Sequence, residues 1–181
     1  AIEPVLSPND ENTVDLRVTV TERHARTLRA GANYRSDAGF GVSTAWEHRN
    51  LSGKGERLTA GVLFAETERE VSVGLRRPGY NLRNQALLFQ SKWTYEETDA
   101  YNSEGLTTFF GVEREKTPEF SWRFGPGFRY ANVEQATSKE EIALLLFPIQ
   151  AFWDTSDDDL HPKDGGRLSL EITPTQELIE G

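Results

Sequence analysis

The chain has 181 residues, 36% of them hydrophobic, and carries 20 Lys and Arg against 29 Asp and Glu, a net charge of −9. It contains no cysteine, which excludes a disulfide framework and a thiolate metal site, and it has no run of about 18 apolar residues to form a transmembrane helix. Nucleic acid is not expected as a partner, because the charge is negative and the basic residues are scattered. A transmembrane β-barrel stays open, since only every second residue of its strands faces lipid.

The first 22 residues differ in pattern from the rest. Pro4, Pro8 and a polar run predict a turn, after which apolar residues alternate with polar ones from Val14 to Val20. This alternation is typical of a short strand with one wet face. We interpret residues 1–22 as the end of a preceding soluble module and residues 23–25 as a linker.

From residue 26 onward the apolar residues recur with period two, which predicts β-strands, and no helical periodicity is sustained. After a first strand at 13–21, we predict strands at 26–36, 39–49, 56–67, 69–77, 85–98, 104–116, 119–134, 140–154 and 166–173. Turn-forming Asn, Asp, Gly and Pro residues separate them. Short connections predict an antiparallel meander, and several strands reach the ~9–11 residues that a tilted strand needs to cross a bilayer.

Aromatic residues occupy alternate positions in two of these strands. One face carries Phe89, Trp93, Tyr95, Phe120, Trp122, Phe124, Phe128 and Tyr130. The opposite face carries glycines and charged residues such as Lys92, Arg123 and Arg129. We predict that the aromatic face points outward to lipid and the charged face lines a wet interior, the alternative being a soluble lipocalin-like barrel with the aromatics inside. The stretch from 142 to 147 is apolar on both faces, and its facing is left open.

Longer stretches of the chain resemble a known family. Tyr34 to Gly41 (YRSDAGFG), followed by Trp46 to Glu56 (WEHRNLSGKGE), resembles the opening hairpins of the BamA/TamA-type outer-membrane assembly barrels. Trp153 to Glu171 resembles a mid-barrel segment of the same family, although Ser156 stands where the family usually has Arg. Val14 to Glu22 (VDLRVTVTE) resembles the last strand of the POTRA domain that precedes such a barrel. The order and spacing of these stretches favour the TamA-like branch.

This resemblance implies an all-β antiparallel meander that forms part of a transmembrane β-barrel. Residues 1–22 would end a POTRA-like periplasmic module, and residues 26–181 would form the N-terminal portion of the barrel, with about nine strands. The implied function is insertion of β-barrel or autotransporter clients into the outer membrane of a Gram-negative bacterium or an organelle of bacterial origin. Expected partners are outer-membrane lipid, client polypeptides and an inner-membrane-anchored or periplasmic helper. No enzyme chemistry, cofactor or metal is expected.

The implied mechanism depends on strand edges. The first barrel strand must pair with the last to close the barrel, and a weak seam would leave backbone N–H and C=O groups free for a client strand. Small side chains favour a weak seam. We therefore predict a client-pairing edge made of Leu28, Arg29, Ala30, Gly31, Ala32 and Asn33. Unpaired edges are expected near 26–35 and 166–173. A passive outer-membrane pore and a two-partner secretion transporter are the alternative functions.

Three other features favour structural roles over chemistry. The histidines, at His24, His48 and His161, have no metal-ligand spacing. The acidic run at 154–164 does not match an EF-hand loop, which favours a solvated hairpin, with a cation site as the alternative. Gly53 and Gly55 superficially resemble a phosphate-binding loop, but the residues after them alternate as a strand, which predicts a turn.

Overall fold

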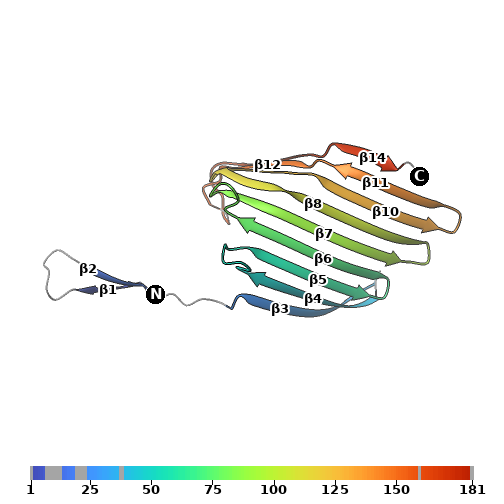
Figure 1. Cartoon of the computed structure of the whole chain (residues 1–181), viewed down its shortest axis with the longest axis horizontal. Helices are drawn as coiled ribbons and strands as arrows, with labels where there is room; N and C mark the ends of the chain where they lie inside the picture. The colour runs from blue at the N-terminus through green and yellow to red at the C-terminus, as the bar shows by residue number, and fades with distance from the viewer. Residues whose placement is uncertain (1, 7–13, 19–23, 37–38, 159, 180–181) are drawn as a thin grey trace.

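The computed structural model describes residues 2–6, 14–18, 24–36, 39–158 and 160–179. All the regular secondary structure of this part of the chain consists of β-strands (Figure 1). No helix among the described residues is long and apolar enough to cross a membrane. The predicted fold class, an all-β antiparallel meander, is confirmed.

The N-terminal strands β1 (Ile2–Leu6) and β2 (Val14–Val18) form a separate two-stranded antiparallel sheet. Strand β2 falls within the strand predicted at 13–21 and is shorter. The predicted linker at 23–25 lies partly outside the described residues, which resume at 24. The assignment of residues 1–22 to a POTRA-like module stays a prediction.

The other twelve strands form one antiparallel sheet, and six of them follow one another in both sequence and space. These six are β3 (Arg26–Arg35), β4 (Gly39–Arg49), β5 (Arg57–Ala65), β6 (Glu68–Pro78), β7 (Gln85–Glu97) and β8 (Tyr101–Thr117). The remaining six are β9 (Phe120–Phe124), β10 (Gly127–Gln135), β11 (Lys139–Leu146), β12 (Ile149–Asp154), β13 (Arg167–Ile172) and β14 (Thr175–Ile179).

Beyond β8, each long strand is interrupted at a proline. The interruptions are Gly125–Pro126 between β9 and β10, Phe147–Pro148 between β11 and β12, and Thr173–Pro174 between β13 and β14. Proline has no N–H, so it cannot donate to the ladder at these points. The register continues unchanged, because Val112 pairs with Phe124 and Phe109 with Gly127. These six short strands therefore act as three long ones, and with β3 to β8 they make the nine strands expected.

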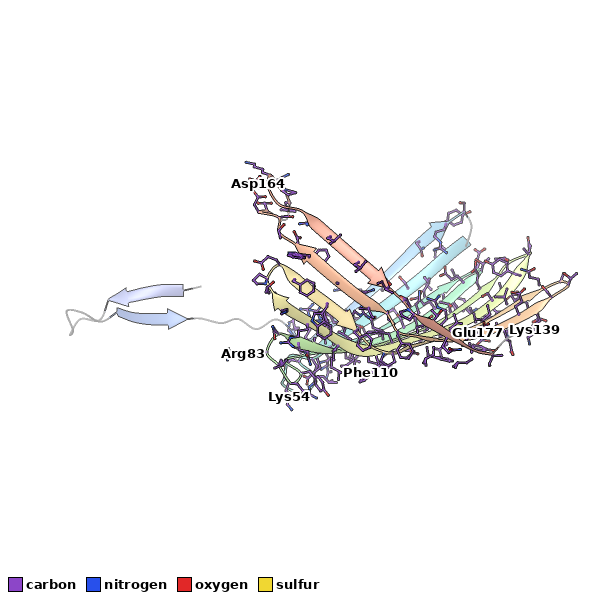
Figure 2. All side chains as sticks on the ribbon, turned by 90° about the horizontal axis from the view of Figure 1, so that it is seen from above. Lys54, Arg83, Phe110, Lys139, Asp164 and Glu177 are labelled. Atoms are coloured by element: carbon purple, nitrogen blue, oxygen red, sulfur yellow. The ribbon has the colours of Figure 1, made fainter. Side chains whose placement is uncertain are left out.

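The sheet is curved, and its two faces differ in polarity. In Figure 2 the blue strands β3 and β4 and the orange strands β12 and β13 rise on the same side, which makes that side concave, whereas Phe110 lies on the convex side. Exposed large apolar side chains of the convex face include Val42, Val62, Phe64, Val71, Phe110, Phe124, Trp153, Leu168 and Leu170. The charged and small residues that alternate with them line the concave face. The aromatic face at 89–95 and 120–130 is thus the convex one, as predicted.

Apolar packing on the concave face centres on a small cluster of Ala86, Leu88 and Phe109. The ring of Phe109 lies over Gly111, where a Cβ atom would collide with it. Aromatic side chains that cover strand glycines in this way compensate for their missing side chain. Leu146 also faces this side, since it lies against Gly127, and this settles the facing that the sequence left open at 142–147.

Candidate functional site: sheet edges and the concave wall

Strand β3 forms one edge of the sheet. It pairs with β4 along its whole length, from Arg26 opposite His48 to Arg35 opposite Gly39. No described strand lies against its other side, so the N–H and C=O groups that point away from β4 have no strand partner in this part of the chain. Such a row can accept a further strand. All residues of the predicted pairing edge, from 28 to 33, lie in β3 and are exposed.

The middle of β3 is held mainly by main-chain hydrogen bonds. Residues 30–32 carry only small side chains, which reach little beyond the backbone. The Thr44 hydroxyl on β4 donates a hydrogen bond to the carbonyl of Arg29 (3.2 Å). At the far end of the strand, Arg35 Nη2 lies 2.5 Å from the Glu68 carboxylate on β6. The edge is therefore anchored by side chains near one end and lightly packed in its centre.

The opposite edge of the sheet is divided between two strands. Among the described strands, β13 pairs only with β12, and β14 pairs only with β11. The edge predicted near 166–173 is found in β13, whereas β14 was missed. The sequence feature that indicates β14 is the partly apolar run after Pro174. This proline interrupts the strand but does not end it. Client pairing at β3 stays a prediction; the edge at β3 and the β13 part of the opposite edge lie where the sequence placed them.

Ion pairs line the concave wall and mark it as the wet face. They include Arg76 with Glu113 (2.6 Å), Lys92 with Glu70 (3.6 Å) and Arg49 with Glu47. Their side chains are partly exposed, so each pair contributes only ~0–1 kcal/mol to stability. Between them lies a trough with a volume of about 790 Å³. On its floor, hydroxyl groups lie over glycines on neighbouring strands, with Ser72 beside Gly61 and Thr59 beside Gly74.

Arg123 links the strands around the first proline break. Its guanidinium carbon lies 4.2 Å from the centroid of the Phe109 ring, and its Nη2 donates a hydrogen bond to Gln90 Oε1 (2.7 Å). Strand β9 is thereby tied to both β7 and β8. The sequence placed Arg123 on the wet face, which is confirmed, but it could not reveal these contacts because period two gives facing only.

The turn between β4 and β5 is organised by Glu56. Its carboxylate accepts hydrogen bonds from the Ser52 hydroxyl (2.5 Å) and from the backbone N–H groups of Ser52 (3.3 Å) and Lys54 (3.1 Å). Only 6% of Glu56 is exposed. The hydrogen bond from Ser52 lowers the pKa of Glu56 to about 2, although burial opposes the shift. Positive φ angles occur at Asn50 (62°), Gly53 (83°) and Gly55 (76°).

These backbone angles are those of a tight turn, so the predicted turn is confirmed. The N–H groups that a phosphate-binding loop would offer to its ligand are occupied here by the protein's own carboxylate. The resemblance of this segment to such a loop is therefore superficial.

In the acidic loop between β12 and β13, too, carboxylates accept hydrogen bonds from backbone N–H groups of the same loop. Asp157 Oδ1 accepts hydrogen bonds from the N–H groups of Lys163 (2.9 Å) and Asp164 (3.1 Å). Asp158 Oδ1 accepts two more, from N–H groups two and three residues further along. These bonds lower the pKa of both carboxyl groups. They support the predicted hairpin; Asp159, which belongs to the same run, lies outside the described residues.

The three histidines lie apart in the fold. His24 precedes β3, His161 lies in the acidic loop, and His48 lies in β4 with its ring edge-on to Trp46 at a centroid distance of 5.8 Å. Within the residues that the structure describes, no group of three or more His, Asp and Glu side chains is placed to hold a metal ion.

The fold of this chain is similar to that of a solved outer-membrane barrel structure. The chain is similar to the crystal structure of BamA from Haemophilus ducreyi lacking POTRA domains 1–3, with a TM-score of 0.67 over 98% of this chain. The sequence identity is 13%, and this chain spans 38% of that one. No family model matches the chain, and no curated protein matches it.

A likeness at this level of identity concerns the fold. The wall described above is a BamA-like barrel sheet, and the barrel part of the resemblance seen in the sequence is confirmed. The TamA-like branch and the POTRA identity of residues 1–22 stay predictions.

Proposed function

We propose that this chain is part of an outer-membrane barrel of the TamA-like branch, in a Gram-negative bacterium or an organelle of bacterial origin, that inserts β-barrel or autotransporter polypeptides. The observation that carries the proposal is the lightly packed, unpaired edge of β3 in a sheet that is apolar outside and polar inside. An apolar convex face suits lipid, and a polar concave face suits a wet lumen. Residues 1–22 would then end a POTRA-like periplasmic module.

The mechanism that we propose is pairing between β3 and an incoming strand. Backbone N–H and C=O groups must be hydrogen-bonded within the bilayer, because lipid offers them no partner. A client strand that enters beside residues 28–33 satisfies its own backbone groups and those of β3 in one step. This mechanism needs no enzyme, cofactor or metal chemistry from the chain, and a periplasmic or inner-membrane-anchored helper would deliver the client.

A disulfide lock at the edge tests this proposal. Ala32→Cys is combined with a cysteine on the strand that lies against β3 in the assembled barrel, and client insertion is measured before and after oxidation. We expect oxidation to stop insertion while the barrel stays folded, and reduction to restore it. The chain has no native cysteine to interfere.

The matched control places the lock inside the sheet. Val62→Cys and Val71→Cys face each other on β5 and β6, so their disulfide joins two strands that are already paired and should leave insertion unchanged. If the oxidised protein, locked at β3, inserts clients as fast as the same protein with the disulfide reduced, the edge is not the site of insertion.

A passive outer-membrane pore is the second candidate, and the polar trough favours it. A pore would keep its conductance when β3 is locked, and it would show no client insertion to lose. A soluble barrel with an apolar ligand inside fits poorly, because the apolar side chains cover the convex face and the concave face is charged.

A further inference from the structure

A single row of side chains crosses the concave face from one strand to the next. Direct cross-strand pairs run from Arg29 to Ala45, Gly61, Ser72, Lys92, Thr107 and Arg129, in that order. All seven side chains line the trough. We call this set the cationic row, because its three charged members are all basic and the residues between them are small.

The charge of the cationic row contrasts with that of the whole protein. The chain carries −9 overall, yet this row contains three cations and no carboxylate. Lys92 forms an ion pair with Glu70 (3.6 Å), which lies on β6 two residues before Ser72 and so outside the row. Within the described residues, neither Arg29 nor Arg129 forms an ion pair within 4 Å, although Glu47, which also lines the trough, interacts with Arg29 at longer range. Cations in a concave wall attract anions, because the curved low-dielectric surface focuses their field.

A second level repeats the excess of positive charge. Arg49, Arg57 and Arg76 lie directly opposite one another on β4, β5 and β6. Like charges in directly opposed positions destabilise a sheet. The carboxylates of Glu47 and Glu113 compensate Arg49 and Arg76, whereas Arg57 has no ion pair in the described part of the chain. This second row thus holds three arginines, with two carboxylates beside it.

The spacing of the cations favours a long ligand over a small one. Neighbouring strands lie ~4.8 Å apart, so Arg29 is about 19 Å from Lys92 along the sheet, and Lys92 about 10 Å from Arg129. A phosphate ion cannot contact cations that are so far apart. The Gly, Ala and Ser residues between them leave room for a backbone to approach, and the curvature of the wall turns the three cations toward a common axis.

We propose that the concave wall binds an extended acidic polypeptide segment, held by Arg29, Lys92 and Arg129. The inference deepens the proposed function, on which it rests for the enclosed lumen, by naming the cargo as polypeptide rich in Asp and Glu. Binding is electrostatic and spread over several side chains, so it tolerates sequence variation and weakens as salt screens the charges.

The test measures binding of a labelled 12-residue peptide of alternating Asp and Ser to the purified protein in detergent micelles by fluorescence anisotropy. A peptide with Asn in place of Asp is the reference. We expect the acidic peptide alone to bind, and its affinity to fall as salt is raised from 50 to 300 mM. The triple variant Arg29→Gln, Lys92→Gln, Arg129→Gln should lose about tenfold in affinity, roughly 1.4 kcal/mol of binding free energy.

The control variant removes the same charge outside the row. Lys54→Gln, Arg83→Gln and Lys116→Gln lie in the turns and at the end of β8, and together they should change the affinity less than twofold. Equal losses in the two triple variants would mean that diffuse charge drives binding, and would overturn the site. Displacement of the peptide by inorganic phosphate at matched ionic strength would also overturn it, in favour of a small-anion site.

The disulfide lock separates this inference from the proposed function. Locking β3 should leave peptide binding intact while client insertion is lost. If insertion survives the lock but the peptide still binds through the cationic row, the proposed function fails and the inference about the lumen stands. If the acidic peptide binds no better than its Asn reference, the inference fails whatever the lock shows.

Discussion

Glu56 joins the turn after β4 to the start of β5 through its carboxylate and through its carbonyl oxygen, which accepts a hydrogen bond from the Asn50 N–H (2.5 Å). Its pKa of about 2 lies below the ordinary value of ~4.3 for a glutamate, so folding favours the ionised form. The stabilisation is therefore complete above about pH 4.5 and is lost as the pH falls toward 2. Arg77, whose Nε lies 4.0 Å from the Glu56 carboxylate, acts in the same direction.

We expect Glu56→Gln to flatten the acid limb of the stability profile. The amide oxygen of Gln still accepts hydrogen bonds from Ser52 and Lys54, but it does not titrate. The urea midpoint should thus fall between pH 5 and pH 2.5 by less in the variant than in the natural protein. Asp157 and Asp158 titrate in both proteins and cancel in the comparison. Parallel pH profiles would show that Glu56 does not control the turn.

At the scale of the elements, the first break, between β9 and β10, depends on close backbone contact. A Cβ atom at Gly125 would collide with the carbonyl oxygen of Phe110 and with the Cα of Gly111. Both atoms belong to the backbone of β8 and cannot move aside. Gly125→Ala should therefore destabilise the sheet by about 1–3 kcal/mol, the usual range for overpacking, measured as a lower urea midpoint.

Gly166→Ala is the matched control for this change. A Cβ atom at Gly166 would meet open space, and its φ is not in the left-handed region. The substitution should stay within about 0.5 kcal/mol of the natural protein, as is usual for surface sites. An equal loss at both positions would mean that the β8–β9 contact has no special role.

The strands themselves could be predicted from the sequence, because alternation records which face of a sheet is wet. The pattern around Phe120 gave the facing of β9 and β10, and glycine and proline gave the turns. The alternation could not show that Pro126, Pro148 and Pro174 interrupt strands without ending them, because proline occurs both at interruptions within a strand and at strand ends. The cationic row was also hidden, because alignment across seven strands requires the register of every pair between Arg29 and Arg129.

At the scale of the whole molecule, the convex face is the surface that we expect to meet lipid. Phe124, which is 43% exposed there, lies beside the first break. Phe124→Arg should destabilise the protein in bilayers by roughly 2–4 kcal/mol if the position lies near the midplane. The measurement is the free energy of unfolding in lipid vesicles, compared with that in detergent.

A concave-face substitution provides the control. Gln150→Arg adds the same charge on β12, where Glu171 on one neighbouring strand offsets Arg123 on the other, and should have little effect in either medium. If Phe124→Arg is tolerated as well in bilayers as Gln150→Arg, the convex face does not contact lipid.

The aligned breaks also constrain which pairings the sheet accepts. A slip of one residue sends every side chain to the wrong face, but a slip of two residues, ~6.6 Å along the strand, keeps every face correct, so polarity cannot oppose it. Moved by two residues against β8, Gly125 would face Phe109 or Glu113 instead of Gly111, and the close backbone contact would be blocked. The glycines and prolines thereby select one register among those that differ by two residues, which all place polar and apolar side chains on the correct faces.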